Sequence, residues 1–451
     1  MIHNIIDTST TIIAPATAAG GAIMVIRLSG RDAIEIADKM FRGRQSLAQA
    51  KGYTLHYGTI RNEQGEVIDD VVVALFRAPH SYTGDDIVEI TTHGSEHICS
   101  ELLRIAIGYG ATMATAGEFT RRAFLAGKMD LSRAEAVADI ISSDSRWSHS
   151  IATTQMRGGY SAKLTELRNE LLRLCSLLEL ELDFSEEDVE FAERTALRTI
   201  LCEVEEQVAS LIASFSVGNA IKNGVNVAIV GEPNVGKSTL LNALVEDDRA
   251  MVSDVAGTTR DTIEATTIID GIRFRFVDTA GLRDTDNQLE QMGITRTYRA
   301  IENAHVILHL TTADNPEFQS IELKDNQAYI KVINKIDKLT SSDDSALYDT
   351  IGISAKLGKN IDTLRSTLRA TVDTSQLNAQ SVVVSNMRHY AALKSAQKAL
   401  TSAHIALDDN LSAELISEDI RQVLHHLGEI TGEVTSDDIL HTIFSKFCIG
   451  K

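Results

Sequence analysis

Apolar residues along this chain change their spacing several times, and each spacing predicts a kind of element. Short apolar or alternating runs, typical of strands, stand at 23–28, 53–61, 67–76, 87–91, 225–230, 272–277 and 329–333. Apolar residues three or four positions apart, typical of amphipathic helices, recur at 32–41, 95–108, 121–126, 133–142, 164–182, 387–407, 414–427 and 437–447. Mixed stretches of strands and helices therefore alternate with purely helical ones.

These changes divide the chain into four stretches and predict a multidomain α/β fold. They are an α+β domain at 1–118, a helical stretch at 119–218, an α/β domain at 219–378 and a second helical stretch at 379–451. The simplest architecture joins the two helical stretches into one discontinuous domain. The α/β domain is then an insertion between Leu211 and Val384, whose ends must lie close together.

Composition narrows the class of protein. The net charge of −20 argues against binding nucleic acid through bulk electrostatics, so RNA contact needs a local basic patch or a partner. Four cysteines stand far apart without a C-x-x-C pair, which excludes a zinc ribbon and favours a reducing compartment. No apolar run approaches the ~20 residues of a membrane span, and no basic targeting segment precedes Arg27. We expect a cytoplasmic protein without membrane contact.

Gly231–Ser238 reads GEPNVGKS, which is the pattern G-x-x-x-x-G-K-S between a strand-like run and a helix start. Glycines let the backbone wrap a phosphate so that successive N–H groups point inward, and the helix N-terminus adds a positive dipole end. Lys237 is expected to reach the β- and γ-phosphates, and the Ser238 hydroxyl to bind Mg²⁺. The pattern predicts a nucleotide-binding phosphate loop.

Three further motifs follow strand-like runs. Asp278–Gly281 (DTAG) offers an acid that can hold Mg²⁺ through water and a glycine N–H that can sense a γ-phosphate. Asn334–Asp337 (NKID) offers a carboxylate that accepts from two guanine N–H groups. Adenine lacks that pair, so discrimination of roughly 10⁴-fold is attainable. Ser354–Lys356 (SAK) fits a loop that closes on the base. Together the motifs predict a guanine-nucleotide-binding domain.

Other polar residues allow more than one interpretation. By pattern alone, Arg27 and Glu89 fit a solvated sheet face, and His93-Gly94 is either part of a site or a turn. The acidic run Glu186–Glu190 fits a helix cap and solvated face better than a metal site. Leu282 stands where small GTPases usually place a water-orienting glutamine, so another group must position water here.

Several segments, spread over the whole chain, resemble the tRNA modification GTPase family known as MnmE or TrmE. They are SYTGDDIVEITTHGS (Ser81–Ser95), GEFTRRAFLAGKMDLSRAEAVADI (Gly117–Ile140), AGTTRD (Ala256–Asp261), DTAGLR (Asp278–Arg283) and FCIGK (Phe447–Lys451). Three departures from the family pattern are small. Ala18-Ala19 replace more polar residues, Ala116 replaces a proline, and Ser95 replaces the second glycine after His93.

The resemblance implies a two-protein enzyme. With an FAD-containing flavoprotein, GidA or MnmG, in a heterotetramer or larger complex, the family builds a carboxymethylaminomethyl-type group at C5 of the wobble uridine of certain tRNAs. The implied N-terminal domain forms the homodimer and binds 5-formyltetrahydrofolate or 5,10-methylenetetrahydrofolate, the source of the one-carbon unit. The family's folate contacts fall on Arg27, Glu89, Lys128 and Lys451. Its near-terminal cysteine, either a packed structural thiol or a reactive one, falls on Cys448.

The resemblance also implies an inserted Ras-like P-loop GTPase domain, a mixed sheet with helices on both faces, whose hydrolysis depends on K⁺ and on dimerisation of two such domains. Glu290 matches the family's catalytic glutamate, which acts through water. Lys237 is the other expected catalytic residue. Potassium ligands fall on Asn234, Ser253, Val255 and Thr258, and Thr259 joins Ser238 on Mg²⁺. The expected GTP contacts are Asn234, Val235, Gly236, Lys237, Ser238, Thr239, Ser253, Asp254, Val255, Ala256, Gly257, Thr258, Thr259, Asp278, Thr279, Ala280, Gly281, Asn334, Lys335, Asp337, Ser354, Ala355 and Lys356.

Two other functions stay open. A GTPase switch of ribosome assembly would use the same nucleotide motifs but predicts a basic terminal RNA-binding domain, whereas this chain has FCIGK and an acidic balance. A folate-dependent aminomethyltransferase with a regulatory GTPase would transfer the one-carbon unit without GTP turnover. Measuring tRNA modification with a non-hydrolysable GTP analogue separates these functions.

Overall fold

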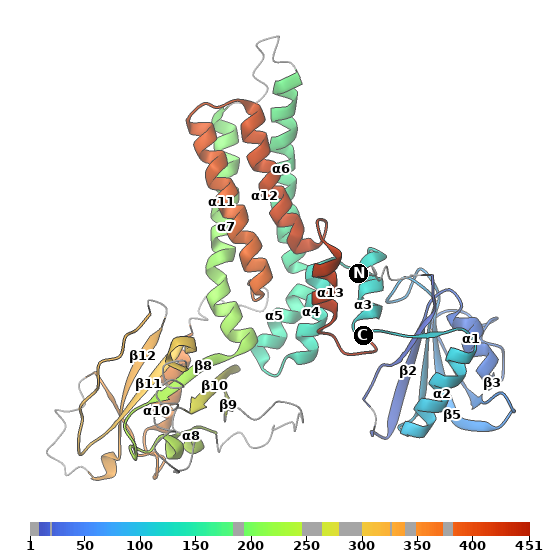
Figure 1. Ribbon diagram of the computed structural model, residues 1–451, viewed down its shortest axis with the longest axis horizontal. Coiled ribbons are helices and arrows are strands. Elements are labelled where there is room, and N and C mark those ends of the chain that lie inside the picture. The colour runs from blue at the N-terminus through green and yellow to red at the C-terminus, as the bar shows by residue number, and fades with distance from the viewer. Residues whose placement is uncertain are drawn as a thin grey trace. The chain divides into compact units, whose positions relative to one another are not determined.

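The computed structural model describes residues 9–18, 20–183, 194–245, 264–278, 300–324, 327–338, 349–372 and 382–451, and Figure 1 shows their elements. The chain divides into two compact units. The first contains residues 1–141, 155–175 and 420–451, and the second contains residues 142–154 and 176–419. Each unit includes one large β-sheet.

The first unit holds a seven-stranded sheet with the strand order β3-β4-β5-β6-β2-β1-β7. Neighbouring strands are antiparallel except for the parallel pair β1–β7. The strands are β1 (Ile12–Pro15), β2 (Ile23–Ser29), β3 (Phe41–Gly43), β4 (Thr54–Arg61), β5 (Val67–Phe76), β6 (Ile87–His93) and β7 (Thr112–Met113). The helices α1 (Ala33–Met40) and α2 (Glu96–Gly108) share one hydrophobic core with this sheet.

Alternation along β5 sorts the two faces of the first sheet. Val71 and Val73 are buried in the core beneath the helices, whereas Val72 between them is exposed. Val72 pairs with Tyr57 of β4, and both Tyr57 and Leu55 are more than 70% exposed. We call the side that carries Leu55, Tyr57 and Val72 the open face.

The predictions for this domain are largely confirmed. β5 has the predicted bounds, β2 and β4 differ from them by one residue, and β6 extends two residues further, to His93. The helices predicted at 32–41 and 95–108 are α1 and α2. The prediction missed β1, β3 and β7, which have 4, 3 and 2 residues. Runs that short carry too little alternation to identify a strand.

Three further helices of the first unit pack together. They are α3 (Glu118–Leu125), α4 (Leu131–Ser142) and α13 (Asp437–Phe444), and their shared cluster includes Leu131, Leu440 and Phe444. Gly117 caps the N-terminus of α3 with a left-handed φ of 67°, and a Cβ there would lie 2.6 Å from the Phe444 oxygen. Beyond α13, Ile449 forms an antiparallel bridge with Ala116. The tail 448–451 therefore returns to the N-terminal part of the chain, as the resemblance implied.

The second unit holds a six-stranded sheet with the strand order β13-β12-β11-β8-β10-β9. All neighbours are parallel except the antiparallel pair β9–β10. The strands are β8 (Val225–Val230), β9 (Glu264–Ile269), β10 (Ile272–Asp278), β11 (Val306–Thr312), β12 (Ala328–Asn334) and β13 (Ile351–Gly352). The helices α8 (Lys237–Val245) and α10 (Ile361–Ala370) cover one face, and the helical residues 300–303 lie at the other. The predicted mixed sheet with helices on both faces is confirmed.

A two-residue turn joins β9 and β10. Asp270 and Gly271 both have positive φ angles, 48° and 78°, which is the turn type that matches the twist of a hairpin. A Cβ on Gly271 would lie 3.2 Å from Trp147 Cδ1. Trp147, in α5 (Arg146–Met156), is half-buried against the core of the second sheet. The hairpin therefore rests on the beginning of α5.

The helices that precede and follow the second sheet lie side by side (Figure 1). In α7 (Arg194–Asn223) and α11 (Met387–Asp408), the rings of Phe215 and Tyr390 stack with centroids 4.3 Å apart. Just before α11, the Val384 N–H donates to Ser214 Oγ at 3.0 Å. This confirms that the ends of the insertion lie close together. α6 (Gly159–Asp183) and α12 (Ala413–Thr431) have residues in both units.

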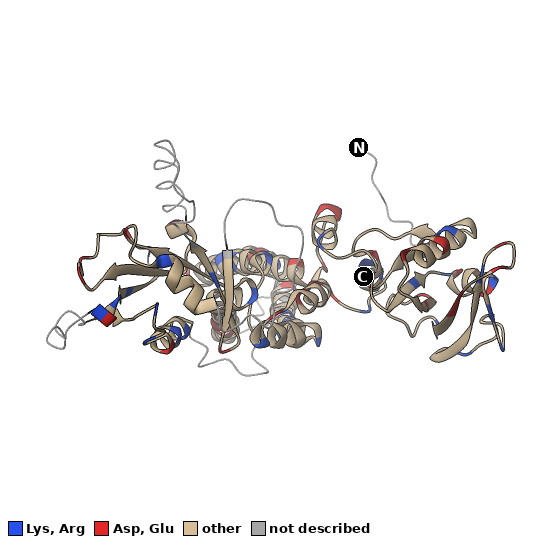
Figure 2. Ribbon diagram, turned by 90° about the horizontal axis from the view of Figure 1, so that it is seen from below, with Lys and Arg blue, Asp and Glu red and all other residues tan. Residues whose placement is uncertain are grey.

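None of the helices in the described residues is long and apolar enough to cross a membrane. Figure 2 shows Lys and Arg positions interspersed with Asp and Glu positions along the described ribbon. The acidic residues are therefore spread over many elements and are not confined to one of them.

Candidate functional site

The phosphate loop lies where β8 ends and α8 begins. Gly231 and Gly236 both have positive φ angles, 150° and 100°. A Cβ on Gly231 would lie 2.2 Å from the Leu310 oxygen, and one on Gly236 would lie 2.4 Å from Asn334 Nδ2. Both positions therefore require glycine, because the backbone of β11 at Gly231 and the Asn334 side chain at Gly236 leave no room for a Cβ atom. The sequence pattern is explained by this close approach.

Lys237 is the first residue of α8 and is 9% exposed. Its Nζ donates to the carbonyls of Gly231 at 2.6 Å and Glu232 at 3.0 Å. The ammonium is thus held at the beginning of the loop, on the same side as the helix N-terminus. Ser238 and Thr239, which follow on the first turn of α8, are exposed and available to a ligand.

Asn334, at the end of β12, connects the three motifs described by the structure. Its Nδ2 donates to the Val235 carbonyl at 2.8 Å, and its Oδ1 accepts from the Ala355 N–H at 3.0 Å. The side chain is buried, with 3% of the residue exposed. Next to it, Lys335 has a left-handed φ of 63° and donates from Nζ to the Asn234 carbonyl at 2.7 Å. The first two residues of NKID therefore fix the phosphate loop and the SAK loop relative to each other.

Asp337 lies beyond that connection, on the 3₁₀ turn η3 (Ile336–Lys338), and is exposed. The buried Ser354 hydroxyl donates to Asp337 Oδ1 at 2.6 Å. This bond lowers the pKa of the Asp337 carboxyl, and the Lys338 and Lys356 charges contribute further. The carboxylate is therefore ionised and oriented, as an acceptor for two ligand N–H groups must be.

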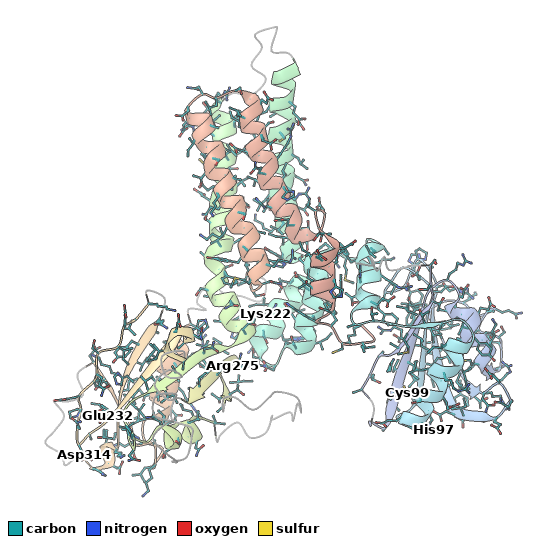
Figure 3. All side chains as sticks on the ribbon, in the orientation of Figure 1. His97, Cys99, Lys222, Glu232, Arg275 and Asp314 are labelled. Atoms are coloured by element: carbon teal, nitrogen blue, oxygen red, sulfur yellow. The ribbon has the colours of Figure 1, made fainter. Side chains whose placement is uncertain are left out.

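The strand ends of the second sheet add residues that the sequence did not single out. Figure 3 shows Glu232 and Asp314 at the same end of this sheet. Glu232 Oε1 accepts from Gln319 Nε2 at 3.4 Å, and Asp314 Oδ2 accepts from Lys338 Nζ at 3.4 Å. Their position directly after β8 and β11 is the signal that could have identified them, because ligands bind at the carboxyl ends of such strands.

Asp278 is the last residue of β10, and its backbone pairs in register with Ile229 of β8. DTAG therefore begins at the same end of the sheet as the phosphate loop. The remaining expected site residues lie outside the described part of the chain. They are Ser253, Asp254, Val255, Ala256, Gly257, Thr258, Thr259, Thr279, Ala280, Gly281 and Glu290, together with Leu282.

A second cluster lies on the first sheet, where Arg27 of β2 faces Glu89 of β6. Arg27 Nε donates to Glu89 Oε1 at 2.8 Å, and its second terminal nitrogen, Nη2, lies 2.7 Å from the same oxygen. The two side chains are 21% and 27% exposed. The two residues do lie on the more exposed face of the sheet, but the charges are not freely solvated, because each is partly desolvated and paired with the other.

Aromatic rings and the tail 448–451 surround this ion pair. The Arg27 guanidinium lies 5.6 Å from the Phe119 ring centroid and 6.0 Å from that of Tyr82. Burial raises the pKa of Tyr82, although its hydrogen bond with Thr120 and the Arg27 charge act in the opposite direction. Arg27 Nη1 donates to the Gly450 carbonyl at 3.3 Å. Sequence reasoning missed Tyr82 and Phe119, although both lie in the segments that carry the resemblance.

The other expected folate residues belong to the same unit. Lys451 follows Gly450 directly, so the tail brings it toward Arg27. Lys128 is exposed and donates from Nζ to the Pro79 carbonyl at 2.5 Å, on the loop that leads to Tyr82. Cys448 is exposed, and its carbonyl accepts from the Gly117 N–H at 3.5 Å. The structure thus unites Arg27, Glu89 and the tail, and it leaves the Lys128 ammonium on an adjoining loop.

His93 is the site-or-turn residue at the end of β6. Its ring Nδ1 lies 2.7 Å from Asp69 Oδ1, and the backbone N–H of His93 donates to Asp69 Oδ2 at 2.8 Å. The buried Asp69 carboxylate therefore fixes the ring at a strand end, where the chain turns into α2. The run Glu186–Glu190 lies outside the described residues.

Comparison with known proteins finds matches along nearly the whole chain. Residues 11–128 match the family model described as GTP-binding protein TrmE N-terminus, and residues 131–448 match the one described as MnmE helical domain. The chain is 48% identical to tRNA modification GTPase MnmE of Bacteroides fragilis, over 98% of this chain and 99% of that protein. It is 47% identical to the protein of the same name from Flavobacterium johnsoniae, with the same coverage.

Among solved structures, the chain is similar to a point variant of Aquifex aeolicus Era bound to GDP.AlF4-. The identity is 29% and the TM-score 0.27, over 38% of this chain and 65% of that one. The likeness is partial, whereas the two family models together cover residues 11–128 and 131–448. The two family models, and relatives that are 47–48% identical over 98% of this chain, show that the chain belongs to the MnmE (TrmE) family of tRNA modification GTPases.

Proposed function

We propose that this protein hydrolyses GTP as part of an enzyme that modifies the wobble uridine of certain tRNAs. The observation that carries the GTP assignment is the Asn334 side chain, which ties the phosphate loop to the loop expected to close on the base. The oriented Asp337 carboxylate supplies the guanine selectivity. The assignment to tRNA comes from the names of the relatives.

GTP hydrolysis relies on residues at the carboxyl ends of the second sheet. Lys237 exchanges its two loop carbonyls for the β- and γ-phosphate oxygens, and it neutralises charge that develops between them. The exposed Ser238 hydroxyl, with Thr259 and the Asp278 carboxylate, is the donor set that would hold Mg²⁺, a cation that prefers oxygen ligands. Glu290 positions the attacking water, because Leu282 lacks a polar group for that role.

A potassium ion would supply the positive charge that other GTPases take from an arginine side chain. The main-chain carbonyl of Asn234 already accepts from Lys335, so its exposed side-chain amide is the group that would bind K⁺. Ser253, Val255 and Thr258 would add oxygen ligands. We expect the cation to bind when two GTPase domains meet.

The cluster around Arg27 would bind a tetrahydrofolate. Glu89 offers a carboxylate to pterin N–H groups, and Arg27 holds that carboxylate in place. The Phe119 and Tyr82 rings provide apolar surface beside the pair. Lys128 and Lys451 are the cations that would pair with the glutamate portion of the cofactor. When bound, the folate supplies the one-carbon unit that reaches uridine C5.

The open face of the first sheet supports a homodimer. Leu55, Tyr57 and Val72 are exposed apolar side chains on neighbouring strands, and the described residues contain nothing that covers them. Glu89 pairs with Ala74, two residues from Val72, so the folate cluster lies on the same face. Contiguous exposed apolar side chains are typical of surfaces that contact another protein. A second copy of this domain is the partner that the family resemblance implies.

Each domain would have one task. Residues 1–118 bind folate and dimerise, residues 219–378 hydrolyse GTP, and residues 119–218 and 379–451 form the helical domain, with the tail 448–451 as a part of the folate site. An FAD-containing flavoprotein, GidA or MnmG, would assemble with the homodimer on tRNA. The contact between the tail and Arg27 favours this function over a ribosome-assembly switch, which needs no such cluster.

The experiment that tests the function is the modified-nucleoside profile of tRNA from cells that lack this protein. The 5-substituted wobble uridines should disappear, return with the wild-type chain, and stay absent with Lys237→Ala. An unchanged profile in the deletion strain would remove the tRNA assignment. GTP turnover by the purified chain, compared with that of Lys237→Ala, tests the GTPase assignment separately.

A further inference from the structure

Two histidines and a glutamate converge near the end of α12. The potential ligand atoms of His425, His426 and Glu429 all lie within 4.8 Å of one another. His426 Nδ1 lies 3.1 Å from Glu429 Oε2, and His425 Nε2 lies 3.7 Å from Glu429 Oε1. Residues three and four positions apart share a helix surface, so Glu429 meets both rings from the following turn.

We propose that these three side chains bind a divalent transition metal ion, Zn²⁺ in particular. With bonds of about 2.1 Å, neighbouring ligand atoms of a tetrahedral zinc site stand about 3.4 Å apart. The two imidazole–carboxylate distances, 3.1 and 3.7 Å, bracket that spacing. A rotation of the His425 ring, whose side chain is 52% exposed, can bring the two ring nitrogens to the same spacing. Water completes the coordination.

The donor set selects the class of metal. Two imidazole nitrogens with one carboxylate suit zinc, nickel or copper, whereas Mg²⁺ and Ca²⁺ prefer sites made of oxygen. This site is therefore chemically different from the magnesium site proposed for GTP. It also needs no nucleotide, since all three ligands come from one helix.

The position along α12 favours a cation. The helix ends at Thr431, so Glu429 belongs to the last turn, where unpaired carbonyls carry partial negative charge. The chain then turns at Gly432, which has a φ of 85°. A Cβ atom added at this position would lie within 3 Å of Leu131 and Phe124. An ion held by Glu429 and the two histidines would stabilise the helix end that sets this packing. The proposed role of the site is therefore structural: the bound ion stabilises the C-terminal end of α12.

The test is a zinc titration of the full chain, free of nucleotide and with its thiols reduced, against a competing chromogenic chelator. Wild type should bind one zinc ion. Each of His425→Ala, His426→Ala and Glu429→Gln should lower the zinc affinity at least about tenfold. The exposed Cys202 and Cys448 are common to all variants, so their contribution cancels. Co²⁺ should give the visible absorption of a tetrahedral site in wild type, and this absorption should be lost in His426→Ala.

His404→Ala is the matched control. His404 Nε2 lies 3.1 Å from Glu205 Oε2, the same separation as in the His426–Glu429 pair, but no third ligand joins it among the described residues. This substitution should leave zinc affinity unchanged. The proposal is overturned if zinc binds the His425→Ala/His426→Ala double variant as tightly as wild type, or if His404→Ala weakens binding as much as His426→Ala does. Far-UV circular dichroism confirms that each variant is folded.

Discussion

Asn334→Ala is the substitution whose effect the structure defines best. The side chain makes two hydrogen bonds of 2.8 and 3.0 Å, one as donor to Val235 and one as acceptor from Ala355. Alanine removes both bonds and leaves the Val235 carbonyl and the Ala355 N–H without that partner in a site that is 3% exposed. Each such buried group costs about 1–3 kcal/mol. We therefore expect a total loss of about 2–5 kcal/mol, allowing for partial relaxation.

This loss should appear mainly in nucleotide binding, since the two bonds join loops that both contact GTP in the proposed complex. If half of this free energy is lost from nucleotide binding, GTP affinity falls by roughly 5- to 60-fold, because each 1.4 kcal/mol is a factor of ten. The assay is equilibrium binding of a fluorescent GTP analogue, with the free energy of unfolding measured on the same preparations.

Asn226→Ala is the control for Asn334→Ala. Asn226 lies on β8 of the same sheet, but among the described residues its Nδ2 donates only to the Asn303 carbonyl, at 3.4 Å in an exposed position. We expect its GTP affinity and free energy of unfolding to change little. An Asn334→Ala protein that binds GTP within threefold of wild type, with unchanged stability, would refute the reasoning that these two bonds organise the site.

Three further predictions concern the tail, the potassium site and the pH dependence. Deleting Cys448–Lys451 should abolish binding of 5-formyltetrahydrofolate and tRNA modification while sparing GTP hydrolysis, because the tail contacts Arg27; full folate affinity after the deletion would contradict this. GTP turnover should be fast in K⁺ and slow in Na⁺, Asn234→Ala should lose the difference, and Glu290→Ala should bind GTP without hydrolysing it; equal wild-type rates in the two ions would exclude the cation's role. The lowered pKa of Asp337 means that its ionised form persists to more acidic pH than an ordinary aspartate, and GTP affinity should fall only as pH drops through that lowered value. Ser354→Ala removes the main cause, so its affinity should fall at a higher pH than wild type, and identical profiles would show that the hydrogen bond has no such effect.

The predictions from sequence succeeded where a local pattern determines the structure. The ten-residue strand β5 is rich in apolar residues and follows the turn at 62–65, so its bounds could be predicted, and from Asp69 to Phe76 buried residues alternate with more exposed ones. The phosphate loop could be predicted as well, since Gly231 and Gly236 are required by contacts that any such loop makes. Motif order then placed Asn334 and Asp337 in the same site.

The predictions were incomplete where the structure depends on distant parts of the chain. Arg27 and Glu89 are 62 positions apart, and only the register of β2 with β6 makes them an ion pair. The Gly450 carbonyl that joins them is 423 positions from Arg27. No periodicity encodes such pairings, so pattern alone assigned both charges to solvent, and only the family resemblance indicated their shared role.

The contact between Trp147 and the β9–β10 hairpin gives this protein a natural optical probe. Trp147 is the single tryptophan of the sequence, and it belongs to the second unit. Its emission during denaturation therefore follows the unfolding of that unit alone, whereas far-UV circular dichroism follows the helices and strands of both units. Coincident transitions would mean that the two units unfold as one cooperative system, and separate transitions would give each unit its own midpoint. A zinc ion bound at His425, His426 and Glu429, in the first unit, should then raise the midpoint of that unit and leave the tryptophan transition where it was.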